Sequence, residues 1–138
     1  MDALPISLIR HLADFGMLVI LWLVQLVIYP SFLRISADQL VLWHRSYTTR
    51  VGFVIIPTMF TQLFCQLWAA TTSGGTLNYL SLTTVLVCWI LTFFVSVPLH
   101  NKISNGEGEP ATLNRLIQTN WPRTVLWTLA FILGIAAA

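Results

Sequence analysis

The chain has 138 residues, of which 57% are hydrophobic and only 9% are charged, and its mean hydropathy is +0.78. A typical soluble domain is about 45–50% apolar and about 25% charged. The composition therefore excludes an ordinary soluble domain and a disordered chain. The formal net charge of +2 is too small to indicate a nucleic-acid-binding protein. We expect residues 1–138 to form a single transmembrane domain.

Four apolar runs in the sequence are each long enough to cross a bilayer as a helix. About 20 helical residues are needed to cross a hydrocarbon core of about 30 Å. The sequence therefore predicts an all-α fold, an integral membrane four-helix bundle, with spans at approximately residues 10–33, 48–70, 77–99 and 119–137.

The segments between the runs also carry helix signals. Ser36 and Gln39 have the spacing of a capping box, which predicts a helix that starts there and forms an amphipathic extension preceding the second span. Pro110 suits the first turn of a short cytoplasmic helix before the fourth span. Pro57 and Pro98 lie inside spans, where each removes a backbone hydrogen bond and favours a kink.

The distribution of basic residues predicts the orientation of the chain. Positive residues near span ends are retained on the cytoplasmic side. This rule places loops 34–50 and 100–123 in the cytoplasm of a bacterium and both termini in the periplasm, with the chain as a multi-pass protein of the inner membrane. Arg10 alone lies on the outer side, and the residues assigned to the inner side are Arg34, Arg45, Arg50, Lys102, Arg115 and Arg123.

Motifs of soluble enzymes are absent from the sequence. Cys65 and Cys88 fall inside apolar runs without a paired spacing, so we expect neither a disulfide framework nor a thiolate zinc site. There is no glycine-rich phosphate loop, no GxSxG and no HExxH. A metal site normally needs three or four ligands, and the carboxylates on the inner side lie in loops. We therefore expect no metal site, and the sequence identifies no cofactor.

Polar residues recur at helical spacing along all four runs. An unpaired polar group is costly in lipid, so these stripes should face inward and form a polar seam. The seam widens toward the cytoplasmic ends of the helices, and this mouth is the candidate site. The predicted catalytic residues are His44, His100 and Arg123, and the predicted ligand-binding residues are Gln25, Tyr29, Gln62, Asn101 and Asn120.

Two structural readings stay open beside this site. Amide and hydroxyl side chains commonly hold membrane helices together, and helix packing alone accounts for Gln25 and Gln62. At the outer end, Arg10 and Asp14 have the spacing of a helical ion pair, with His11 beside them. We interpret that outer cluster as structural.

Four short motifs resemble a group of small bacterial four-span membrane proteins of unknown function. The group is distantly similar to the anthrone-oxygenase-like membrane proteins, which also place a Pro-Leu-Asn-type motif after span three and an Asn…Arg-Thr motif at the start of span four. The resemblance implies an aromatic or quinone-like ligand, and it does not imply the oxygenase reaction itself. This chain has Gln62 where the family pattern often has a carboxylate, so chemistry that needs an acid there is in doubt. The motifs are Val24–Pro30, Trp43–Arg45, Val97–Lys102 and Thr119–Thr124.

Two functions follow from these observations. The first is binding of an apolar, aromatic or quinone-like molecule at the cytoplasmic-side mouth, with an oxygenase-like or isomerase-like activity as one form of it. A histidine would then act as the base, and Arg123 would stabilise an oxyanion. The alternative is a non-catalytic accessory subunit of a larger membrane complex, or a homo-oligomer. In both cases the bilayer is a partner and nucleic acid is not.

Overall fold

The structure, a computed structural model, describes residues 5–138, and in that range it is helical with no strand. Two of the four long helical rods contain a five-residue π-helical turn. The first rod comprises α1 (Ile6–Leu23), the π turn η1 (Val24–Ile28) and α2 (Tyr29–Phe32). The second is α3 (Ala37–Thr72). The third comprises α4 (Thr76–Leu91), η2 (Thr92–Ser96) and α5 (Val97–Ser104), and the fourth is α6 (Pro110–Ala136).

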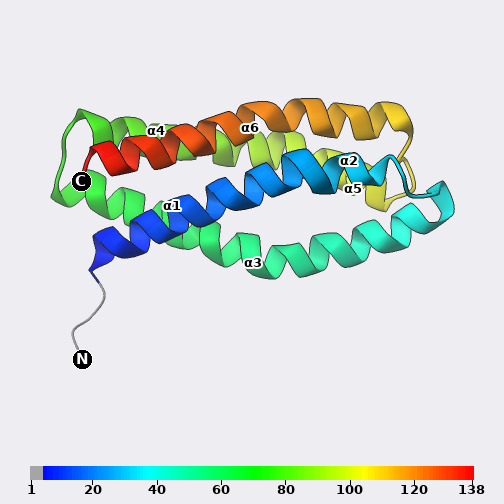
Figure 1. The fold of residues 1–138 in the computed structure, drawn as a ribbon, viewed down its shortest axis with the longest axis horizontal. Helices are drawn as coiled ribbons and strands as arrows, with labels where there is room; N and C mark the ends of the chain where they lie inside the picture. Colours follow the sequence, from blue (N-terminus) through cyan, green and yellow to red (C-terminus); the bar gives the residue numbers. More distant parts are fainter. Residues whose placement is uncertain (1–4) are drawn as a thin grey trace.

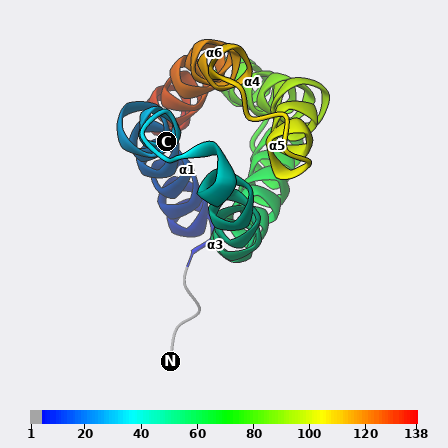
Figure 2. The ribbon, with the colours of Figure 1, turned by 90° about the vertical axis from the view of Figure 1, so that its right-hand side faces the viewer.

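The four rods form an up-and-down bundle whose order around the ring follows the chain (Figures 1 and 2). α1 packs against α3 and α6, and α4 packs against the same two helices. Short connections make successive helices antiparallel neighbours. The connection between α3 and α4 turns at Gly74 and Gly75, whose φ angles of 63° and 83° disfavour residues with a side chain.

The bundle has two distinct ends, which we name by their connections. The hairpin end holds both described chain ends and the turn between α3 and α4 (Figure 1). The loop end holds the connection from α2 to α3 and the connection from α5 to α6.

Three of the rods are long and apolar enough to cross a membrane, and this agrees with a membrane protein. They are Ile6–Phe32, Ala37–Thr72 and Thr76–Ser104, with mean hydropathies of 2.1, 1.5 and 2.2 over their most apolar windows. The bundle presents large apolar side chains outward; Phe53 and Phe94 are 77% and 78% exposed. An apolar outer surface of this kind suits lipid and not water.

The segments before the second and fourth predicted spans are helical, with two differences from expectation. α3 begins at Ala37, the start expected from the sequence, and runs without a break to Thr72. The predicted capping box is wrong, because the Ser36 side chain makes no capping bond. Its backbone carbonyl accepts a hydrogen bond from the backbone N–H of Gln39 instead. The short helix predicted before the fourth span is continuous with it, since α6 runs unbroken from Pro110.

Prolines affect the rods in two different ways. Pro30 and Pro98 each lie in the first turn of an α-helix that directly follows a π turn. A proline has no N–H to donate and its ring clashes with the preceding turn, so the wider π geometry relieves the helix at that point. Pro57 lies within α3 and Pro122 within α6, and both helices continue through them.

Candidate functional site

A chain of four hydrogen-bonded side chains runs into the core from the loop end. Ser104 Oγ lies 2.9 Å from His44 Nδ1, His44 Nε2 lies 2.8 Å from His100 Nδ1, and His100 Nε2 lies 2.9 Å from the Tyr29 hydroxyl. The groups come from α2, α3 and α5, so this relay joins three rods. His44 is 0% exposed and Tyr29 is also buried.

The relay has a property that follows from imidazole chemistry. A neutral imidazole donates from one ring nitrogen and accepts at the other, and all four ring nitrogens of His44 and His100 are engaged. The donors can therefore all point from Ser104 toward Tyr29, or all point the opposite way. Passing one proton along the chain converts the first arrangement into the second and leaves every group neutral.

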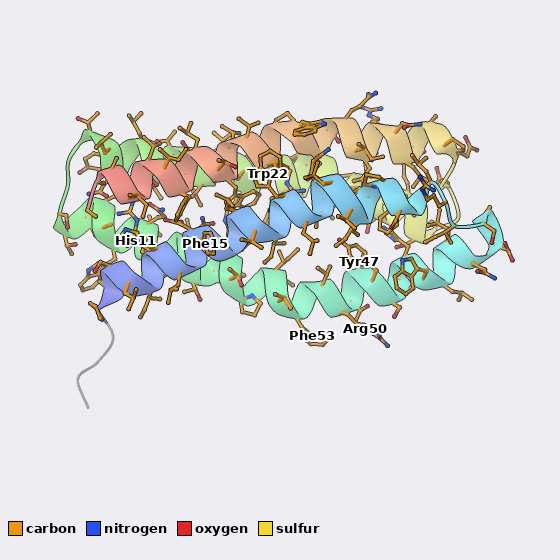
Figure 3. The ribbon with its side chains drawn as sticks, in the orientation of Figure 1. His11, Phe15, Trp22, Tyr47, Arg50 and Phe53 are labelled. Atoms are coloured by element: carbon orange, nitrogen blue, oxygen red, sulfur yellow. The ribbon has the colours of Figure 1, made fainter. Side chains whose placement is uncertain are left out.

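Aromatic rings enclose the relay. The Phe32 ring lies edge-on to His44 and to Tyr47, with centroids 5.4 Å apart in both pairs. Tyr47 lies 6.2 Å from His44 and 6.5 Å from His100 between ring centroids. Figure 3 shows Tyr47 pointing from α3 toward the first rod, whereas Arg50 and Phe53 point away from the bundle. These rings keep the histidines in a largely apolar environment.

Tyr47 also borders a hollow of about 290 Å³ on the surface of α3. Trp43, Ser46, Arg50 and Val51 form the rest of its lining. Tyr47 therefore belongs both to the lining of this hollow and to the rings around the two histidines.

A second polar group surrounds Arg123, which lies at the midpoint of α6 and is 5% exposed. Its Nε donates to Thr92 Oγ1 at 3.1 Å, and its Nη1 donates to Ser96 Oγ at 2.9 Å and to Asn120 Oδ1 at 2.8 Å. Asn120 Nδ2 in turn donates to Gln25 Oε1 at 2.8 Å. The sequence placed Arg123 at the mouth of the bundle, whereas the structure places it halfway along its helix.

Both π turns supply partners to this group. Gln25 belongs to η1, and Thr92 and Ser96 belong to η2. The turns therefore flank α6 at the depth of Asn120 and Arg123. π turns inside α-helices occur frequently at functional sites, and here two of them converge on one buried cation.

A third polar group lies toward the hairpin end, around the buried carboxylate of Asp14. Gln62 Nε2 donates to Asp14 Oδ1 at 2.7 Å, and Gln66 Nε2 lies 3.1 Å and 3.0 Å from its two oxygens. Arg10 Nε lies 3.8 Å from Asp14 Oδ2, and Arg10 Nη1 donates to Asn78 Oδ1 at 2.7 Å. The pairing of Arg10 with Asp14 agrees with the structural reading of this cluster.

Trp127 links the second and third groups. Its indole Nε1 donates to Gln62 Oε1 at 2.8 Å, and its ring lies 5.4 Å from the Arg123 guanidinium carbon in a cation–π contact. The side chain is fully buried. The polar seam expected from the sequence therefore extends along most of the bundle and does not stop at the loop end.

Seven of the eight predicted site residues fall into the three polar groups, and one lies outside them. Tyr29, His44 and His100 meet in the relay, and Gln25, Asn120 and Arg123 meet around the guanidinium. Gln62 belongs to the Asp14 group, and Asn101 lies exposed on α5.

Four further residues of these groups were not among the predicted site residues: Ser104, Trp127, Thr92 and Ser96. Ser104 extends the four-residue spacing of Thr92, Ser96 and His100, and this periodicity was the available signal. Trp127 likewise follows Arg123 by four residues and Asn120 by seven, which places it on the same helix face. Its bond to Gln62 depends on which helices are neighbours.

Comparison of the chain with protein-family models, with curated proteins and with solved structures finds no match.

Proposed function

We propose that the protein is a four-span inner-membrane protein that binds the oxygen-bearing end of an apolar, aromatic or quinone-like molecule and exchanges a proton with it. The relay from Ser104 to Tyr29 is the observation that carries this proposal. Amide and hydroxyl contacts suffice to hold helices together, whereas two adjoining histidines that end on a buried phenol provide a route for protons.

The arrangement of α6 supports the fourth span. Its 27 residues correspond to about 40 Å at 1.5 Å per residue, which exceeds a hydrocarbon core of about 30 Å. It packs along α1 and α4, both of which belong to candidate spans. Basic residues at the loop end support a cytoplasmic position for that end; they include Arg34, Arg45, Lys102 and Arg115.

The surroundings of the relay favour an apolar ring as the ligand. Phe32 and Tyr47 supply ring faces beside the histidines, and the hollow next to Tyr47 adjoins the outward face of α3. A ligand dissolved in the membrane would reach the relay from this side by displacing the Tyr47 ring. Its oxygen would then lie near the Tyr29 hydroxyl, the inner end of the relay.

The proton balance of the exchange follows from the hydrogen bonds. Tyr29 gives its hydroxyl proton to the ligand oxygen and takes one from His100 Nε2. His100 Nδ1 takes a proton from His44 Nε2, and His44 Nδ1 takes one from Ser104, which regains it from water at the loop end. One proton moves from the loop end to the ligand, and each side chain ends neutral. In this scheme Tyr29 is the residue that touches the ligand, and the histidines supply it.

The proposal is tested by measuring the binding of 1,4-naphthoquinone to purified protein in nanodiscs. Quenching of tryptophan fluorescence reports the binding. We expect His44→Ala and His100→Ala to weaken binding at least tenfold, because each removes one link of the relay. His11→Ala is the matched control, since His11 lies at the hairpin end beside the Gly134 carbonyl. Monodisperse elution of all three variants confirms folding. Equal binding by all three, or no saturable binding by the wild type, would overturn the proposal.

A further inference from the structure

The charges inside the bundle do not balance. Arg10, Asp14 and Arg123 are the charged side chains buried in residues 5–138. Asp14 is paired with Arg10, and this is the one ion pair found within that part of the chain. The guanidinium of Arg123 therefore remains a buried cation without a counter-charge from the described residues.

The partners of Arg123 stabilise its position and leave its charge uncompensated. Its acceptors are two hydroxyls and an amide oxygen, all neutral, and the Trp127 ring covers it by a cation–π contact. A guanidinium has five N–H donors, and these three bonds engage Nε and Nη1. The two N–H groups of the other terminal nitrogen remain for a further acceptor.

That remaining donor capacity lies next to the inner end of the relay. Arg123 Nη1 donates to Asn120 Oδ1, and Asn120 reaches the first rod through Gln25. Gln25, one turn before Tyr29 on the first rod, is held to α6 through Asn120, which brings this part of the first rod to the depth of Arg123. A ligand oxygen at Tyr29 would therefore also face the guanidinium.

We propose that the ligand binds as an oxyanion and that Arg123 is its counter-charge. This inference rests on the proposed function and narrows its ligand class to acidic phenols and hydroxyquinones. Burial of a charge is costly unless the charge is paired and hydrogen-bonded, and an ionisable residue inside a membrane protein is a candidate functional site. A neutral quinone would leave the guanidinium uncompensated, whereas a phenolate or an ionised hydroxyquinone neutralises it.

A matched pair of probes tests this inference on the wild-type protein. 2-Hydroxy-1,4-naphthoquinone is ionised at neutral pH, and 2-methoxy-1,4-naphthoquinone has nearly the same shape without the charge. We expect the hydroxy compound to bind at least tenfold more tightly at pH 7 in nanodiscs of neutral lipid. The preference should disappear when the pH is lowered below the pKa of the hydroxy compound, because both probes are then uncharged.

Two variants with the same change in net charge identify the cation. Arg123→Gln should abolish the preference for the ionised probe. Arg115→Gln should keep it, because Arg115 lies exposed on the same helix about two turns away. Should Arg123→Gln fail to fold, the affinities of the wild type for the two probes and their pH dependence still show whether the ligand binds as an oxyanion.

The outcomes separate this inference from the function on which it rests. Equal affinity of the wild type for both probes, or a preference that survives Arg123→Gln, overturns the role of Arg123 and leaves the relay proposal intact. Absence of saturable binding of 1,4-naphthoquinone to the wild type overturns the proposed function itself. A preference for the ionised probe that is lost in Arg123→Gln and kept in Arg115→Gln supports Arg123 as the counter-charge.

Discussion

Gly134 of α6 is the position where the packing of the Asp14 group can be tested most directly. A β-carbon built at Gly134 would lie 2.9 Å from Asp14 Oδ2 and 3.6 Å from Arg10 Nη2. The first distance is shorter than ordinary van der Waals contact, so Gly134→Ala requires the carboxylate to move. The carboxylate is held by the amides of Gln62 and Gln66, and its movement would weaken those bonds.

The expected magnitude follows from comparison with a second helical glycine. Gly52 lies inside α3, and a β-carbon there would meet only Ile56 Cδ1 at 3.7 Å, an ordinary contact. Replacement of a helical glycine by alanine favours the helix by about 1 kcal/mol, and this gain applies to both positions. Overpacking typically costs about 1–3 kcal/mol. We therefore expect Gly134→Ala to be about 1–3 kcal/mol less stable than Gly52→Ala.

Both variants are unfolded reversibly in mixed micelles with increasing dodecyl sulfate. Circular dichroism measures the loss of helix at each step. The free energy of unfolding of Gly52→Ala should equal or exceed that of the wild type. If Gly134→Ala proves as stable as Gly52→Ala, the carboxylate of Asp14 is not fixed against α6, and the described packing at the hairpin end is wrong.

Two further predictions address the core and the orientation. Trp127→Phe removes the indole donor to the buried Gln62 oxygen and should lower the free energy of unfolding by about 1–3 kcal/mol through the unsatisfied acceptor. Trp22→Phe, at a half-buried indole, should cost less; equal losses would contradict the role of Trp127. Cysteines introduced at Ser73 and Asn105 should lie on opposite sides of the membrane. An impermeant maleimide should label the first in spheroplasts and the second only after lysis, and labelling of both in spheroplasts would refute the orientation.

Helical periodicity and hydropathy were sufficient for the architecture at the level of helices. Three of the four predicted spans lie in helices that are long and apolar enough to cross a membrane, and the helix expected to start after Ser36 begins at Ala37. Local hydrogen-bond chemistry was less predictable. Ser36 occupies the expected capping position, but its backbone carbonyl and not its side chain accepts the hydrogen bond from the helix.

The same periodicity predicted part of the polar interior. Positions four residues apart share a helix face, so Gln25 and Tyr29 were correctly expected on one stripe. The assignment of depth was less successful. Gln62 lies about 27 Å along α3 from His44 at 1.5 Å per residue and therefore belongs with Asp14. Asn101 follows His100 directly and is turned about 100° away from it, so it faces outward.

The sequence by itself determined that the chain forms apolar helices with inward polar stripes, because both properties depend on residues near one another in the chain. Only the tertiary structure decided which stripes meet. The contact between His44 and His100, the bonds from Gln62 and Gln66 to Asp14 and the uncompensated charge of Arg123 depend on helix order, depth and rotation. These quantities are set by packing between distant segments, and no local pattern encodes them.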